Sequence, residues 1–297
     1  MASLRQIRQR LRSTQSTKQI MRAMQLVSAS KLKRAQGRLM QARATLGFLD
    51  GLLQRVLAAH AGAPPRRGKR DHGLEHPLCA SRHEQPVALA IFTSDAGLCG
   101  SYNTNLIQLA ESHVRRDSLQ RTQVIYIGKK GYRYLTKRGY PAAGSFLGLA
   151  GRPDLSTADA IGRSLMGRFL SGQVGAVDLV YSQFVSSMTY RPTILRWLPV
   201  QLSPQPSALS PQQEYLFEPS PQRVFEDLLP RWAIATFQLV MLEAFTSEHS
   251  ARMVAMKNAT DNAEELLTAL TMQRNNIRQA AITKELSEIV GTAEALK

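Results

Sequence analysis

The chain has 297 residues, 43% of them hydrophobic, and a formal net charge of +16, so it is long enough for one large domain or for a medium domain with an extension. It contains no run of ~18 apolar residues, which argues against a membrane-spanning helix, and its basic start lacks the apolar stretch of a secretory signal. The two cysteines, Cys79 and Cys99, are too few for a disulfide framework, which fits a reducing compartment.

Residues 1–58 are predicted to form one long helix. Apolar and small residues recur every three to four positions from Leu4 to Val56, in a heptad register without proline. Between residues 18 and 28 this seam becomes polar. In that stretch the apolar stripe is expected to pass to Ile20, Met24 and Val27. A helix of this length would extend ~80 Å, too far to lie across one compact domain, so it needs a partner helix.

The positive charge is concentrated in this first helix. Residues 1–49 carry eleven Lys and Arg and no acid, whereas residues 231–297 carry seven basic and eight acidic residues. The asymmetry indicates that the N-terminal segment meets a negatively charged partner. A solvated helix face, nucleic acid and an acidic protein surface are all compatible with the charge alone.

The middle of the chain has the pattern of an α/β domain. Residues 59–86, with four prolines and the basic cluster 66–70, are expected to form a flexible basic insertion. Strands alternating with helices then predict an α/β layer domain over residues 87–202. The expected strands are 87–92, 124–127, 177–181 and 193–200, and the expected helices lie around 106–114, 129–138 and 156–170.

A proline-rich linker, residues 203–222, leads to a second long helix, predicted over residues 223–297. Its apolar positions recur from Leu242 to Ala280 through Leu266, and a shifted stripe finishes the chain. This stripe consists of Ile282, Leu286, Ile289, Ala293 and Leu296. The economical interpretation is a Rossmann-like α/β domain flanked by two terminal helices that pair as an antiparallel coiled coil.

No catalytic constellation stands out. The turn Thr93–Asn105 lies between a strand and a helix, where phosphate loops occur, but Gly97 and Gly100 match no nucleotide motif and no Lys follows them. We therefore favour a structural turn over nucleotide binding. Cys99 has no base near it in a recognisable motif, and the six histidines are irregularly spaced. No cofactor and no metal site is predicted.

Several segments, spread from the first residue to the last helix, resemble the gamma-subunit family of F-type ATP synthases. They are Met1–Gln36, the turn SDAGLCG at residues 94–100 with Asn103 and Asn105, EYLFEP at Glu214–Pro219, Ser247–Leu267 and Ile277–Val290. The chain departs from the family at Ala96 and Ser101, where Arg and Gly are usual, at Gly291–Ala293 and in the insertion. Whether it is its host's principal copy or a second, divergent one stays open.

The resemblance implies a central rotary shaft that couples ion translocation through a membrane ring to ATP synthesis or hydrolysis. The chain would be a non-catalytic subunit, with alpha, beta and epsilon subunits and the membrane c-ring as partners. Because Met1 begins directly at the family signature, the expected location is the cytoplasmic face of a bacterial plasma (inner) membrane. The rivals are a basic coiled-coil protein that binds nucleic acid, disfavoured by the nearly neutral C-terminal helix, and a small-molecule α/β enzyme, which the turn does not support.

The resemblance also implies site residues. Those expected to couple to beta are Met24, Arg252, Gln279, Thr283 and Glu285. Tyr215 and Glu218 match the foot that meets the membrane ring and epsilon. A basic face suited to an acidic loop on beta comprises Lys18, Arg22, Lys31, Lys33 and Arg34. The apolar tip, which would need a low-friction bearing, comprises Ile282, Ile289, Ala293 and Leu296.

Overall fold

The computed structural model describes residues 4–61, 76–82, 84–117, 119–149, 154–201 and 217–295. The chain divides into two compact units. We call Lys31–Ala251 the sheet unit, and Met1–Ser30 together with Arg252–Lys297 the helical unit. Two long helices, α1 (Leu4–Ala61) and α5 (Pro221–Ala295), contribute to both units.

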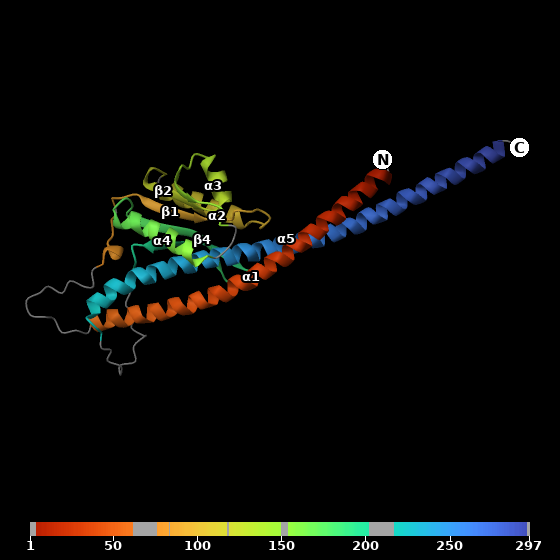
Figure 1. Ribbon diagram of the computed structural model, residues 1–297. Helices are drawn as coiled ribbons and strands as arrows, with labels where there is room; N and C mark the ends of the chain where they lie inside the picture. The colour runs from red at the N-terminus through yellow and green to blue at the C-terminus, as the bar shows by residue number, and fades with distance from the viewer. Residues whose placement is uncertain are drawn as a thin grey trace, which may run out of the picture. The chain divides into compact units, whose positions relative to one another are not determined.

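The sheet unit is built on a five-stranded sheet in the order β3-β2-β1-β4-β5 (Figure 1). The strands are β1 (Val87–Phe92), β2 (Thr122–Ile127), β3 (Ala142–Phe146), β4 (Ala176–Phe184) and β5 (Tyr190–Leu198). The first four are parallel, and β5 runs antiparallel to β4. β1 lies at the centre of the sheet, with every residue from Ala88 onward buried, because its apolar run suits a strand covered on both faces.

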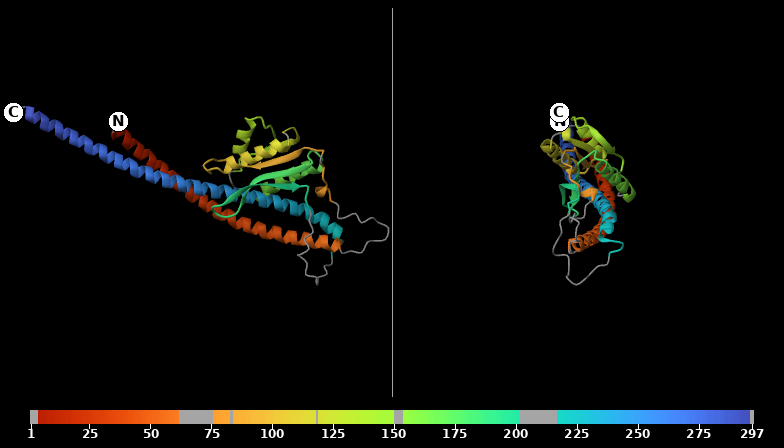
Figure 2. Two further views of the ribbon diagram at one scale, coloured as in Figure 1. Left: turned by 180° about the vertical axis from the view of Figure 1, so that it is seen from behind. Right: turned by 90° about the vertical axis from the view of Figure 1, so that its left-hand side faces the viewer.

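Helices cover both faces of this sheet. α2 (Tyr102–Asp117) and α3 (Lys129–Thr136) pack on one face, where Leu89 and Ile91 of β1 join their core. α4 (Leu155–Leu170) and the first part of α5 pack on the other face, against Ala88 and Ala90. Alternate residues of one strand thus serve opposite cores, as the two-residue period of a strand requires. Figure 2 shows the same three layers from behind.

The four strands expected from the sequence are all present, and one further strand was missed. β3 has the sequence AAGSF, lies at the edge of the sheet and keeps most of its residues exposed. Its small residues and short length leave no apolar run for a pattern to detect. The α/β domain and the long terminal helices that pack against each other confirm the predicted fold class.

The predicted heptad seam of α1 is present, but the predicted shift of its apolar stripe between residues 18 and 28 is wrong. All the seam positions from Leu4 to Val56 are buried or half-buried, including the polar ones. Ile20 and Val27 instead remain 60% and 55% exposed, and only Met24 of the expected stripe is half-buried. The seam accommodates Lys18 because its ammonium pairs with Glu264 on α5 at 3.1 Å while only 23% of the Lys18 side chain is exposed.

α5 is a single helix that begins at Pro221 and contains Pro230. Met256, Ala263 and Leu270 are buried as the periodicity predicts, whereas Leu266 is 50% exposed, which corrects its place in the predicted seam. One window of α5 is long and apolar enough to cross a membrane, with a mean hydropathy of 1.2, but 56% of it is buried inside the protein. Burial of this kind is ordinary for the core helix of a soluble domain.

The segments beside the two long helices are described only in part. Much of the expected insertion (59–86) and linker (203–222) lies outside the described residues. Within the first, α1 continues to Ala61, and Pro77–Cys79 forms a short 3-10 helix whose Leu78 is fully buried. Leu78 also accepts a backbone hydrogen bond of 2.8 Å from Val200. This part of the predicted flexible segment is therefore a packed piece of the core.

Candidate functional site: the paired helices and their attachment to the sheet

In the helical unit, the first part of α1 and the stretch 252–270 of α5 each bury one side in a seam. Ile7 of α1 is 1% exposed, and Ala263 and Leu270 of α5 are 7% and 8% exposed, so each helix buries apolar side chains here. Lys18 and Glu264 add an ion pair. Small Ala263 at the seam permits close approach of the two helices. In the sheet unit, α1 and α5 meet again through Arg43 and Glu243. The partner of Lys18 is Glu264, and the partner of Arg43 is Glu243. Residue numbers therefore rise along α1 as they fall along α5, so the pairing is antiparallel.

The contact between Arg43 and Glu243 also reaches the sheet. Nη2 of Arg43 donates to Oε1 of Glu243 at 2.6 Å and to the backbone carbonyl of Phe184, at the end of β4, at 2.9 Å. Glu243 is only 4% exposed and accepts a further hydrogen bond from the Tyr181 hydroxyl of β4. One guanidinium and one carboxylate therefore tie together two long helices and a strand.

Burial and neighbouring groups shift the pKa values of Tyr181 on β4 and of Glu243 on α5. Burial raises the pKa of Glu243, and the Arg43 guanidinium and the Tyr181 hydroxyl oppose this without cancelling it. Burial, with the nearby Glu243, raises the pKa of Tyr181 to about 12. Desolvation disfavours the charged form of each acid. The cluster therefore combines hydrogen bonds with one ion pair.

A series of further hydrogen bonds fixes α5 against the sheet unit. Residues 241–250 of α5 are all buried although six of the ten are polar. Ser247 and Ser250 donate through their hydroxyls to the carbonyls of Ser182 and Ser187, at 2.9 and 2.7 Å. From the opposite face of the sheet, the Tyr102 hydroxyl donates to the carbonyl of Ala244 at 3.0 Å. Directional bonds of this kind fix both the rotation of a helix about its axis and its register.

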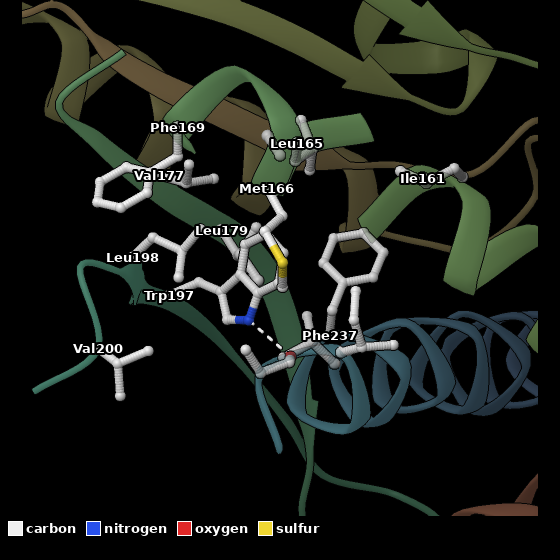
Figure 3. Close-up of a cluster of buried hydrophobic side chains, with 14 of the residues drawn as sticks. Ile161, Leu165, Met166, Phe169, Val177, Leu179, Trp197, Leu198, Val200 and Phe237 are labelled. Atoms are coloured by element: carbon white, nitrogen blue, oxygen red, sulfur yellow. Dashed lines mark hydrogen bonds between the residues drawn. The ribbon is translucent and has the colours of Figure 1, made fainter. Parts of the chain in front are cut away.

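Nearer the start of α5, the attachment is made by an aromatic side chain. The indole Nε1 of Trp197, on β5, donates to the carbonyl of Ala233 at 2.8 Å. Figure 3 shows this bond and the buried side chains of α4, β4 and α5 around the indole. The ring also packs against Phe237, with 5.2 Å between ring centroids. Trp197 combines a large buried surface with a satisfied polar atom, as buried tryptophans usually do.

The turn after β1 is held by its own side chains. Oδ1 of Asp95 accepts from the backbone N–H of Lys129 at 3.0 Å and from that of Gly148 at 3.1 Å. The Asn103 side chain accepts from the backbone N–H of Ser94 at 2.9 Å. A Cβ on Gly128 (φ 105°) would lie 1.9 Å from the carbonyl oxygen of Thr93, so only glycine fits there. The turn joins β1, α2, α3 and β3, which fits the structural role expected for it.

In the described part of the chain, no cysteine or histidine lies in an arrangement that indicates a catalytic or metal-binding site. Cys99 is buried, 2% exposed, and its sulfur accepts a contact from the Asn103 amide at 3.1 Å. His113 lies 3.0 Å from Asp178, which also bonds Arg196. These three side chains connect α2 to β4 and β5. Among the described residues, no three His, Cys, Asp or Glu side chains come together as a metal-binding group.

The predicted site residues fall in several environments. On α1, Met24 and Lys18 are half-buried, and the exposed cations are Arg22, Lys31, Lys33 and Arg34. On α5, Arg252 is buried at 8% exposure, whereas the exposed residues are Gln279, Ile282, Thr283, Glu285 and Ile289. Glu218 is exposed. Tyr215 and Leu296 lie outside the described residues, and only the backbone of Ala293 is described, within α5.

The attachment of α5 to the sheet was not foreseen from the sequence. Arg43 resembles the other basic residues of the first helix, and its partner Glu243 stands 200 positions away. The one available signal was the run of polar residues in an otherwise apolar part of α5, Thr246–Ser250. A polar run at core positions indicates buried hydrogen bonds but does not identify the partner.

Comparison with known proteins gives matches along nearly the whole chain. A family model described as ATP synthase matches residues 3–296. The chain is 41% identical over 297 residues to an ATP synthase gamma chain of Desulforamulus reducens, covering all of both proteins. It is 40% identical to one of Symbiobacterium thermophilum, covering 98% of this chain and 97% of the relative.

Solved structures share the fold at lower identity. A chain of the Euglena gracilis mitochondrial ATP synthase matches with a TM-score of 0.65 and 18% identity, covering 99% of this chain and 94% of the other. A chain from the central stalk and c-ring of the Tetrahymena thermophila mitochondrial ATP synthase matches with a TM-score of 0.58 and 22% identity. It covers 81% of this chain and 99% of the other.

Proposed function

Because the chain belongs to the ATP synthase gamma-chain family, it is the central rotary shaft of an F-type ATP synthase, and we propose that its paired helices transmit torque while the chain itself catalyses no reaction. The observation that carries this proposal is the attachment of α5 to the sheet. A helix that transmits torque must not turn about its own axis within its mounting. The buried contacts of Glu243, Ser247 and Ser250 oppose such a turn.

The catalytic partners are proposed to be alpha and beta subunits arranged as a hexamer around the helices. The contacts of this chain with the beta subunits would be made by Met24, Arg252, Gln279, Thr283 and Glu285. The cations Lys18, Arg22, Lys31, Lys33 and Arg34 would face an acidic loop on beta. Four of these five cations are exposed, and rim charges of this kind steer association and fix its register.

The last turns of α5 are proposed to be the bearing of the shaft. Every side chain described from Arg278 to Thr292 is exposed, and Ile282, Leu286 and Ile289 form an apolar row among them, each at least 50% exposed. An apolar row on a single helix is costly in water and indicates a partner. Together with Ala293 and Leu296, these residues would turn inside an apolar sleeve, where dispersion contacts without directional bonds allow rotation.

The foot of the shaft is proposed to lie at the start of α5. Glu218 is exposed just before the helix begins at Pro221, and with Tyr215 it would contact epsilon and the c-ring. The complex of this family is membrane-associated. We place the chain at the cytoplasmic face of the bacterial plasma membrane as a peripheral subunit, bound only through the complex. The family match over the whole chain gives no support to the nucleic-acid alternative.

Co-expression with the alpha and beta subunits of the same host tests this function. A stoichiometric complex should form, and its ATPase rate should fall when residues 280–297 are deleted. A chain in which Ile282, Leu286 and Ile289 are replaced by Gln keeps the helix length and separates the bearing from simple shortening. Failure to assemble with alpha and beta would overturn the assignment.

A further inference from the structure

A groove of about 580 Å³ lies between α2 and α3, on the face of the sheet opposite α4 and the first part of α5. None of the functions proposed above uses it. One wall is Asn103, Thr104, Ile107 and Gln108 of α2, and the other is Lys130, Arg133, Tyr134, Lys137 and Arg138 of α3 and the turn after it. Its volume is within the range of ordinary binding pockets, and no carboxylate is among the described residues that line it.

The basic wall follows one face of α3. The cations and Tyr134 are spaced as one helix surface, whereas Gly131 and Leu135 turn the other surface toward the sheet. The floor is apolar: Ile107 is 7% exposed, and the Tyr134 ring, 41% exposed, is covered by the Arg138 guanidinium 4.4 Å from its centroid. The groove thus combines an apolar floor with a cationic rim.

Most of this charge is not balanced within the described chain. Arg138 lies 3.6 Å from Glu111, but among the described residues no carboxylate forms an ion pair with Lys130, Arg133 or Lys137. The carbonyl end of α3 favours the cations at 137 and 138, whereas Lys130 stands at the opposite, positive end of the helix dipole. An anionic partner would relieve the mutual repulsion of these cations.

The groove does not suit a phosphate. Free backbone N–H groups at the start of a helix are what usually hold a phosphate. In the first turn of α3 those of Lys129, Lys130 and Gly131 already donate to Asp95, to the carbonyl of Ser94 and to the hydroxyl of Thr93, each at 3.0 Å. An anion here must be held by long side chains spread along a helix, which suits several separate carboxylates better than one compact phosphate.

We propose that the groove between α2 and α3 docks an acidic amphipathic segment of a partner protein. Carboxylates at helical spacing would pair with Lys130, Arg133 and Lys137, and one apolar side chain between them would cover Ile107 and Tyr134. This is a helix-in-groove contact, in which an apolar stripe anchors a helix and flanking charges select it. The proposal does not depend on torque transmission, because the residues that line the groove differ from those that attach α5 to the sheet.

Binding to the full chain tests the chemistry. The probe is a fluorescent 20-residue helical peptide with Glu and Leu on one face, and its control is the same peptide with Gln for every Glu. The variant Lys130→Gln/Arg133→Gln/Lys137→Gln should bind the acidic peptide about tenfold more weakly. A matched variant, Arg10→Gln/Lys257→Gln/Arg278→Gln, loses the same charge from exposed helix positions and should bind within about twofold of the wild type. Equal weakening in both variants, or equal binding of the two peptides, would overturn the proposal.

Cross-linking in the purified complex identifies the occupant. With the photoreactive residue p-benzoylphenylalanine in place of Tyr134, irradiation should attach an acidic protein segment, and the triple groove variant should reduce the yield at least fivefold while the matched variant does not. Attachment of lipid, nucleic acid or a segment without acidic residues would refute an acidic protein partner. A cross-linking yield for the otherwise unaltered chain that is no higher than the yield for the triple groove variant would also refute it.

Discussion

Arg43 on α1 donates a hydrogen bond of 2.6 Å to Glu243 on α5, across 200 positions of sequence. Because the same guanidinium also bonds the carbonyl of Phe184 on β4, the contact joins the two terminal helices to the sheet in one place. Glu243 is almost fully buried, whereas the Arg43 side chain keeps 44% of its exposure. The pair is thus a buried carboxylate held by a guanidinium that still contacts water.

Replacing Arg43 should destabilise the sheet unit. Arg43→Ala leaves the Glu243 carboxylate buried with no cation, so we expect the free energy of unfolding at neutral pH to fall by about 2 kcal/mol. Lys33→Ala, which removes an exposed cation from the same helix, should change it by less than about 0.5 kcal/mol. Urea denaturation followed by tryptophan fluorescence measures both. Equal effects would mean that the Glu243 carboxylate does not need its partner.

The raised pKa of Glu243 predicts a specific pH dependence. Since burial raises this pKa in the folded chain, the folded state holds the proton more tightly than the unfolded state. The stability contributed by this group is full below its unfolded pKa of about 4.3 and is lost as the pH rises through the higher folded value. The stability of the wild type relative to Glu243→Gln should therefore decline from pH 4 to pH 7.

Urea denaturation of both proteins at each pH gives this difference directly, because the other carboxylates titrate alike in the two. A difference that instead grows with pH would show that the ion pair with Arg43 outweighs burial and that the pKa of Glu243 is lowered.

The elements of the fold that were predictable are those whose periodicity is long or whose apolar runs are continuous. β1 is a six-residue apolar run, and α1 keeps one register over its whole length, so both were found. β3 escaped because its five residues are small and lie at the sheet edge. Ile20 and Val27 were wrongly predicted to be buried because they are the apolar residues of this stretch. The buried seam instead keeps its register through Lys18, which pairs with Glu264.

The candidate site was less predictable because its partners are distant in sequence. Resemblance to a family supplied the shaft residues, but it did not indicate that Arg43 meets Glu243 or that Trp197 bonds Ala233. The basic helix at 129–138 was recognised from its sequence, yet a groove needs a second wall. That wall comes from α2, which only the folded chain brings alongside.

Asp95 should be essential for the turn after β1. Asp95→Ala removes the acceptor for the N–H groups of Lys129 and Gly148, so we expect a loss of about 1–2 kcal/mol. Amide hydrogen exchange should accelerate at Lys129 and at Gly148, whereas amides of β4 should exchange as in the wild type. Asp95→Asn keeps an acceptor oxygen and should lose less than half as much. If both variants were equally destabilised, the carboxylate charge rather than its hydrogen bonds would be what matters.

Two neighbouring positions on α1 distinguish the observed seam from the predicted shift of the apolar stripe. Leu32 is 4% exposed and Val27 is 55% exposed. Leu32→Ala should therefore cost about 2–3 kcal/mol because it removes buried methyl groups and leaves a cavity. Val27→Ala should change the stability by less than about 0.5 kcal/mol, since that side chain already lies in water and alanine is the better helix former. Urea titrations followed by far-ultraviolet circular dichroism report on both helices. A cost above about 1 kcal/mol for Val27→Ala would restore the apolar stripe to Ile20 and Val27 and would mean that α1 is rotated about its axis in this stretch.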